Sequence, residues 1–309
     1  MTQGPLKFTR RALVGAAGAL GAAAALPRGL AAAPGPVHLR PIPSTGEEVP
    51  AIGMGTWITF NVSRDPRLRA GRLDVFDNFF AMGGRLVDSS PMYGSSEEVV
   101  GYCRAQRPQA PLFSATKVWT MFRAMGVRQM EASRTLWGVA RFDLMQIHNM
   151  LDWETHLATL KDWKAQGRVR LIGITTSHGR RHDDLAAAMA REPFDAVQFT
   201  YNIVDREAEK RLLPLAAERR QAVIVNRPFR EGALIDHVKR HPLPPFAAEI
   251  DCTNWAQFLL KFIISHPAVT CAIPATSRAD HMRENMGALT GRLPDAQMRA
   301  RMIRHVEGL

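Results

Sequence analysis

The sequence predicts an α/β fold, a (β/α)8 TIM barrel, and three observations lead to it. Eight short apolar segments alternate with segments of helical periodicity from about residue 52 to residue 286. The links between these segments are short, and repeated strand–helix units indicate parallel strands. No G-x-G-x-x-G motif follows the first strand, which weakens the case for an open dinucleotide-binding sheet. Eight units favour a closed barrel, and an open doubly wound sheet stays the alternative.

The expected elements follow one another along the chain. Strands are expected at residues 52–57, 85–87, 112–118, 142–148, 169–175, 196–199, 222–226 and 269–273. Helices are expected at residues 68–82, 96–104, 127–136, 155–165, 184–190, 207–219, 255–265 and 280–286, with a final helix from about residue 295. Leu73, Phe76 and Phe80 give the first helix its 3.6-residue period, and Gly83 and Gly84 end it. A Pro-rich linker, a turn at 44–48 and a long proline-containing loop at 230–252 complete the prediction.

The first 33 residues carry the marks of an export signal. Arg10 and Arg11 precede a modest apolar run at residues 12–26, and the small residues at 31–33 suit a cleavage site. This stretch resembles a bacterial twin-arginine (Tat) signal peptide. We therefore expect a signal peptide at residues 1–33, a single barrel domain at 34–309, the Tat export machinery as a partner and a periplasmic protein. An uncleaved or disordered tail is the alternative.

Composition and charge argue against a nucleic-acid-binding, membrane-inserted, disulfide-rich or metal-binding protein. The formal net charge is +11, and removing residues 1–33 takes away four cations and no acid, which leaves +7. The remaining arginines are scattered and no nucleic-acid-binding motif is found, so we expect no nucleic-acid partner. The run at 12–26 is rich in Gly and Ala and would make a poor spanning helix, so no stable membrane insertion is expected. Cys103, Cys252 and Cys271 lie far apart and indicate neither a disulfide framework nor a metal site.

Four side chains with acid–base chemistry lie at or just after the ends of successive expected strands. Asp88, Lys117 and His148 end three strands, and Tyr93 lies on the loop that follows the first of them. In a barrel of parallel strands these ends meet on one face. A phenol has an ordinary pKa near ~10, and a neighbouring lysine cation stabilises its anion. The four residues therefore predict an acid–base site in which His148 donates a hydrogen bond to a substrate carbonyl. Taken singly, each has a plainer interpretation, as a cap, a packed ring, a surface lysine or a buried histidine.

With these residues in place, the sequence resembles the aldo-keto reductase family from about residue 40 to about residue 290. The matching stretches are residues 53–57, 87–97, 116–117, 146–148, 198–202, 273–274 and 284–285. The family is a (β/α)8 barrel that reduces aldehydes and ketones to alcohols with NADPH, less often with NADH. The resemblance implies that Tyr93 is the proton donor while hydride passes from the nicotinamide to the carbonyl carbon. It also implies that Asp88, Lys117 and His148 complete a catalytic tetrad.

The resemblance also implies a cofactor site. By position in the family's motifs, its residues are Thr56, Trp57, Thr175, Thr176, Gln198, Arg227, Phe229, Thr276, Ser277, Arg278, His281, Glu284 and Asn285. Two departures weaken the expected grip on the cofactor. Thr175 and Thr176 stand where many members have Ser-Asn, and Ala275 and His281 stand where a lysine and an arginine hold the 2′-phosphate. NADP(H) is favoured because most members of the family use it, and NAD(H) stays the alternative.

Four further residues predict an apolar pocket for a small-molecule carbonyl substrate. Trp57, Met92, Trp119 and Met150 all follow strand ends, and core packing is the competing interpretation for each. A carbonyl reductase is the leading hypothesis for the chain. A cofactor-binding redox sensor or partner subunit with little turnover is the second, and the complete tetrad argues against it. A metal-dependent barrel hydrolase is weaker, because only Asp88 and His148 are well placed as metal ligands.

Overall fold

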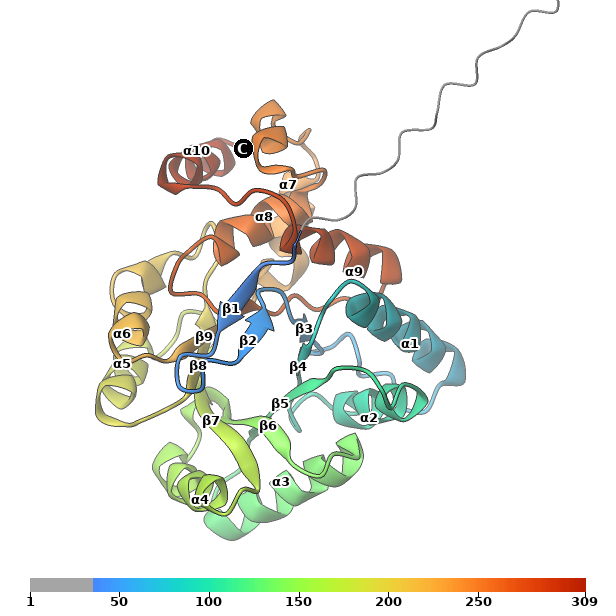
Figure 1. Ribbon diagram of the computed structural model, residues 1–309, viewed down its shortest axis with the longest axis vertical. Helices are drawn as coiled ribbons and strands as arrows, with labels where there is room; N and C mark the ends of the chain where they lie inside the picture. The colour runs from blue at the N-terminus through green and yellow to red at the C-terminus, as the bar shows by residue number, and fades with distance from the viewer. Residues whose placement is uncertain (1–35) are drawn as a thin grey trace, which may run out of the picture. The chain divides into compact units, whose positions relative to one another are not determined.

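The computed structural model describes residues 36–309 of the 309-residue chain. The predicted signal peptide at residues 1–33 therefore lies outside the described residues. The described part follows the predicted barrel (Figure 1).

Eight parallel strands form one sheet, in the order β10-β9-β8-β7-β6-β5-β4-β3. Their bounds are β3 (Met54–Gly55), β4 (Leu86–Asp88), β5 (Phe113–Val118), β6 (Phe142–Ile147), β7 (Val169–Thr175), β8 (Ala196–Thr200), β9 (Ala222–Asn226) and β10 (Cys271–Ala272). Every neighbouring pair in this order is parallel, and each strand is followed by a helix that returns the chain to the start of the next strand. The (β/α)8 TIM barrel predicted from the sequence is confirmed.

The first and last strands of the sheet meet and almost close the barrel. The backbone N–H of Gly53 donates to the carbonyl of Ala272 at 2.8 Å, and that of Gly55 donates to Pro274 at 3.0 Å. A Cβ placed on Gly55 would lie 2.8 Å from the carbonyl oxygen of Ile273. Glycine is required at this position because the two backbones approach too closely for any side chain.

The helices surround the strands, as the ring of coiled ribbons in Figure 1 shows. Their bounds are α1 (Pro66–Ala81), α2 (Ser96–Gln106), α3 (Arg123–Trp137), α4 (Trp153–Ala165), α5 (His182–Arg191), α6 (Leu212–Glu218), α7 (Ala233–Val238), α8 (Trp255–Ile264), α9 (Ala279–Met286) and α10 (Ala296–Glu307). Local capping sets several of their starts. Asp65 accepts from the N–H of Leu68 at 2.9 Å with Pro66 at the first helical position, and Asn254 caps α8 in the same way.

A small hairpin that the sequence analysis did not predict lies across the amino-terminal end of the barrel. Strands β1 (Leu39–Pro41) and β2 (Glu48–Pro50) pair antiparallel where a Pro-rich linker and a turn were expected (Figure 1). Its Ile42 and Val49 join the apolar cluster inside the barrel. The linker prediction is therefore wrong for residues 39–41, whereas the expected turn does lie between the two strands. Pro41 and Pro50 each lie at the end of a short strand, a position where proline is tolerated.

Inside the barrel, residues alternate along each strand between the interior and the surrounding helices. The amino-terminal half of the interior is apolar and is built from Leu86, Phe113, Ala115, Leu144, Leu171, Ala196, Ala222 and Ile224. Two or four residues closer to the carboxyl end, the inward-facing residues of several strands are polar instead. Among them are Asp88, Lys117, Gln146 and Gln198. An apolar floor thus supports a polar layer at the carboxyl ends.

Two further expectations are corrected by the structure. The expected loop at 230–252 contains helix α7 and a 3-10 turn at Pro245–Ile250. The expected helix at 207–219 is divided into a short 3-10 turn, Glu207–Glu209, and helix α6. Pro214 explains the division, because a continuous helix would place it in the interior, whereas in α6 it occupies the first turn. Within residues 36–309, no helix is long and apolar enough to cross a membrane.

Candidate active site

A cavity of about 650 Å³ opens at the carboxyl ends of the strands. Three of the four predicted catalytic residues, Asp88, Tyr93 and His148, line it. The fourth, Lys117, is completely buried behind them and contacts Asp88. The same cavity is also lined by Thr175 and Gln198 and by Glu284 and Asn285 in the last turn of α9. The structure thus brings the predicted acid–base residues together at a single cavity. No group of three or more potential metal ligands occurs among residues 36–309.

A buried ion pair forms the back of the site. The Lys117 ammonium donates to a carboxylate oxygen of Asp88 and, at 2.8 Å, to the carbonyl of Ser89. Neither charged side chain is more than 2% exposed, so each depends on the other for compensation. Burial disfavours the charged form of Lys117, but the Asp88 carboxylate and Tyr93 outweigh it and raise the pKa of the lysine. Lys117 is therefore a fixed cation at neutral pH.

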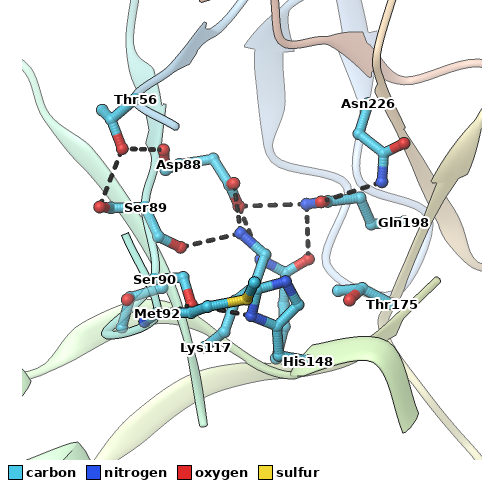
Figure 2. A network of polar contacts seen from close by, with 12 residues as sticks. Thr56, Asp88, Ser89, Ser90, Met92, Lys117, His148, Thr175, Gln198 and Asn226 are labelled. Carbon is cyan, nitrogen blue, oxygen red and sulfur yellow. Dashed lines mark hydrogen bonds and ion pairs between the residues drawn. The ribbon is translucent and has the colours of Figure 1, made fainter. Parts of the chain in front are cut away.

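Amide side chains from two other strands hold the second oxygen of Asp88. Gln146 on β6 and Gln198 on β8 both donate to this oxygen, at 2.8 and 3.1 Å. Asn226 on β9 in turn donates to the Gln198 side chain at 3.4 Å and to the carbonyl of Thr176 at 2.8 Å (Figure 2). Neither Gln146 nor Asn226 was predicted to be a site residue. The sequence does indicate that both side chains face the barrel interior, because each lies two or four residues after an inward-facing apolar residue of the same strand.

Tyr93 is positioned by a tight turn. Its backbone N–H donates to the carbonyl of Ser90 at 2.9 Å, with Pro91 at the second position of the turn, where its fixed φ is favourable. The ring lies edge-on to His148, with centroids 5.6 Å apart, and the Lys117 ammonium is 5.2 Å from its centroid. Burial raises the pKa of Tyr93, and the nearby cation only partly opposes the rise. The expectation from sequence stressed the lysine, but in the structure burial dominates and the phenol keeps its proton.

His148 begins a 3-10 turn directly after β6 and is 5% exposed. Its Nδ1 is 2.8 Å from the hydroxyl of Ser90 (Figure 2). Burial and the charge of Lys117 lower the pKa of His148 to about 2. The imidazole is therefore neutral at physiological pH, so one ring nitrogen carries a proton and the other accepts.

Most residues predicted to bind a cofactor line the same cavity. These are Thr56, Trp57, Thr175, Gln198, Arg227, Phe229, Thr276, His281, Glu284 and Asn285. Thr176, Ser277 and Arg278 are not part of the lining. Arg278 instead forms an exposed ion pair with Asp280. The hydroxyl of Thr176 is buried and has no hydrogen-bond partner among the described residues.

The predicted substrate-pocket residues separate into two pairs. Trp57 and Met92 line the cavity beside Tyr93. Trp119 and Met150 do not: Trp119 is 40% exposed on the β5–α3 loop, and Met150 is buried in the core outside the barrel. The segment after β9 also contributes, since Ile235 of α7 and Lys239, directly after this helix, line the cavity. An apolar wall is therefore present, but only part of it comes from the predicted residues.

The fold and the site together define an enzyme of the (β/α)8-barrel class with an acid–base centre at the carboxyl ends of its strands. The aldo/keto reductase family model matches residues 51–302. The chain therefore belongs to the aldo/keto reductase family and is an oxidoreductase of that type.

Individual relatives are distant but extend over most of the chain. An NADH-specific methylglyoxal reductase of Escherichia coli is 23% identical, covering 83% of this chain and 94% of its own. A probable aldo-keto reductase of Glycine max is 22% identical, covering 82% and 85%. An aldo/keto reductase from Klebsiella pneumoniae, solved with NADP and acetate, has a TM-score of 0.73 at 24% identity, covering 84% of this chain and 93% of that one. At this identity the structural likeness supports the fold alone.

Proposed function

We propose that the protein reduces aldehydes or ketones to alcohols with a nicotinamide cofactor, with Tyr93 as the proton donor. The observation that carries the proposal is the pairing of a protonated phenol and a neutral imidazole at a single cavity, backed by a buried cation. A carbonyl oxygen that gains negative charge during reduction needs such donors near it. Lys117, Asp88 and the glutamine amides keep this arrangement rigid.

The residues along the cavity fit a nicotinamide cofactor. Tyr93 and Asn285 line the same cavity, and its volume of about 650 Å³ lies within the range of ligand sites. The Thr175 and Gln198 side chains line the cavity and offer a hydroxyl and an amide that suit a carboxamide. When bound, the cofactor supplies the hydride that adds to the carbonyl carbon.

The chain's own residues handle the proton. The Tyr93 hydroxyl gives its proton to the carbonyl oxygen, so one hydride and one proton together convert the carbonyl to an alcohol. The phenolate left behind is stabilised by the Lys117 cation until water restores its proton. His148, which stays neutral, directs the carbonyl oxygen toward Tyr93 by donating a hydrogen bond.

We propose NADPH rather than NADH as the preferred cofactor. Klebsiella pneumoniae aldo-keto reductases with this fold were solved with NADP and with NADPH, whereas the Escherichia coli relative is described as NADH-specific. In this chain the candidate contacts for a 2′-phosphate are Thr276, Ser277, Arg278 and His281, since Ala275 offers no charge. Of these, Thr276 and His281 line the cavity. Dissociation constants measured for both cofactors decide the point, and tighter binding of NADH would overturn the preference.

Stopped-flow oxidation of bound cofactor tests whether the protein is an enzyme. The purified protein, loaded with NADPH or NADH, is mixed with a panel of carbonyl compounds that includes methylglyoxal and larger apolar aldehydes. We expect at least one of them to oxidise the bound cofactor within a single turnover. Cofactor binding without oxidation by any carbonyl would favour the alternative, a redox sensor or partner subunit on the same barrel.

We also propose that the protein is exported by the Tat machinery and acts in the periplasm. The support is the sequence of residues 1–33, with adjacent Arg10 and Arg11 before an apolar run. Because this route carries folded proteins, cofactor can travel bound. Replacing both arginines with lysine is expected to leave the protein in the cytoplasmic fraction. An unchanged distribution between fractions would contradict export by this route.

A further inference from the structure

The hydroxyl of Ser90 lies at the junction between the two groups that face the substrate carbonyl. Its oxygen is 2.8 Å from His148 Nδ1 and accepts the backbone N–H of Met92 at 3.2 Å (Figure 2). The backbone carbonyl of the same residue accepts the N–H of Tyr93 and so closes the turn that places the phenol. Ser90 is completely buried. One residue therefore contacts both members of the donor pair, one through its side chain and the other through its backbone.

The direction of the Ser90–His148 hydrogen bond follows from the partners available. The Ser90 oxygen already accepts the Met92 N–H, so the hydroxyl proton is the group that needs a partner. Among the described residues, His148 Nδ1 is the acceptor within reach. If Nδ1 carried a proton instead, the buried Ser90 hydroxyl would be left without an acceptor, which is unfavourable for a buried polar group. The structure thus favours an unprotonated Nδ1.

We propose that Ser90 is a positioning residue that holds His148 in the tautomer with its proton on Nε2. Within residues 36–309 the His148 ring forms a hydrogen bond only through Nδ1, and His148 lines the cavity. The Nε2–H is therefore free to donate to a substrate carbonyl. In the opposite tautomer Nε2 would present a lone pair to that oxygen and repel it. The inference rests on the proposed carbonyl reduction for its purpose, but the tautomer itself does not depend on it.

Nitrogen NMR tests the tautomer directly, without substrate. Long-range ¹H–¹⁵N spectra of the ¹⁵N-histidine-labelled protein distinguish protonated from unprotonated ring nitrogens, and the signals of His148 are those lost in His148→Gln. We expect Nδ1 unprotonated and Nε2 protonated in the wild-type protein between pH 6 and pH 8. A protonated Nδ1 would overturn the proposal whatever the activity of the enzyme.

Variants of Ser90 then test its positioning role. In Ser90→Ala we expect the His148 signals to become those of mixed tautomers and the single-turnover rate to fall about tenfold, as for one lost hydrogen bond. The dissociation constant of the cofactor should not change. Ser90→Thr keeps the hydroxyl and is expected to restore the single tautomer and most of the rate. Ser89→Ala, which removes the neighbouring hydroxyl bonded to Thr56, is the matched control and should leave the His148 signals unchanged.

The outcomes separate this inference from the proposed function. A wild-type protein with the expected tautomer but no carbonyl turnover would contradict the proposed function and leave the Ser90 contact standing. Ser90→Ala with an unchanged His148 spectrum and an unchanged rate would refute the positioning role. Should Ser90→Ala fail to fold, as its melting midpoint would show, the wild-type and Ser90→Thr spectra still decide the matter.

Discussion

Replacing Lys117 with methionine tests whether the buried pair at the back of the site is charged. The substitution keeps much of the side-chain volume and leaves the Asp88 carboxylate buried without its cation. Breaking a buried ion pair in this way costs about 3–5 kcal/mol. Asp88 keeps two amide donors, from Gln146 at 2.8 Å and Gln198 at 3.1 Å, so we expect the lower end, about 3 kcal/mol. For a folded domain of this size, that lowers the melting midpoint by about 5 °C.

Urea unfolding followed by circular dichroism measures this loss, and a double-mutant cycle assigns it. Asp88→Asn removes the other charge, and we expect the two changes together to cost at least about 1 kcal/mol less than their sum. Lys261→Met is the matched control, because this second fully buried lysine donates to two backbone carbonyls, of Ile250 at 2.7 Å and Arg292 at 3.1 Å. Its cost should add to that of Asp88→Asn. If the costs of Lys117→Met and Asp88→Asn also added to within about 0.5 kcal/mol, the charged pair would be refuted.

Three further predictions concern pH, packing and cofactor choice. The pKa of His148 is lowered from 6.5 to about 2, so His148 binds a proton at pH 5 in the unfolded chain but not in the folded chain. Relative to His148→Gln, the free energy of unfolding of the wild type should therefore fall by about 2 kcal/mol between pH 8 and pH 5, and a pH-independent difference would contradict this. A Cβ on Gly173 would lie 2.9 Å from a backbone oxygen of β8, so Gly173→Ala should cost about 1–3 kcal/mol in urea unfolding, whereas Gly71→Ala, in open space on α1, should not destabilise. Asp280→Asn should free Arg278 and tighten NADPH relative to NADH by about twofold to fivefold in fluorescence titrations, and an unchanged ratio would place Arg278 outside the phosphate site.

The part of the site that lies at strand ends could be predicted from the sequence. Asp88 and Lys117 end strands of clear apolar character, and parallel strands bring such ends to one face. The repeated strand–helix order was equally informative for the fold. Tyr93 could be placed because a proline and a glycine on either side restrict the loop that carries it.

Other contacts could not be predicted because they depend on the register between strands. Gln146 and Asn226 reach the site only because β6 and β9 present them on the inner side at the height of Asp88. A single sequence indicates which side of its strand a residue faces, but it does not give the register that sets the residue level with a residue of another strand. The hairpin of β1 and β2 was missed for a different reason: each strand has only three residues and prolines at its ends. Burial of Tyr93 likewise depends on tertiary packing, which is why the direction of its pKa shift was not foreseen.

Tyr93→Phe, compared with the wild type in single-turnover oxidation of bound cofactor by a reactive aldehyde, tests the central claim most directly. The phenylalanine ring keeps the packing against His148 and removes only the hydroxyl that we propose as the proton donor. Loss of a general acid typically lowers the rate about 10²–10⁴-fold, and we predict a fall in this range with an unchanged dissociation constant for the cofactor. A rate within tenfold of the wild type would contradict the assignment of Tyr93 as the proton donor.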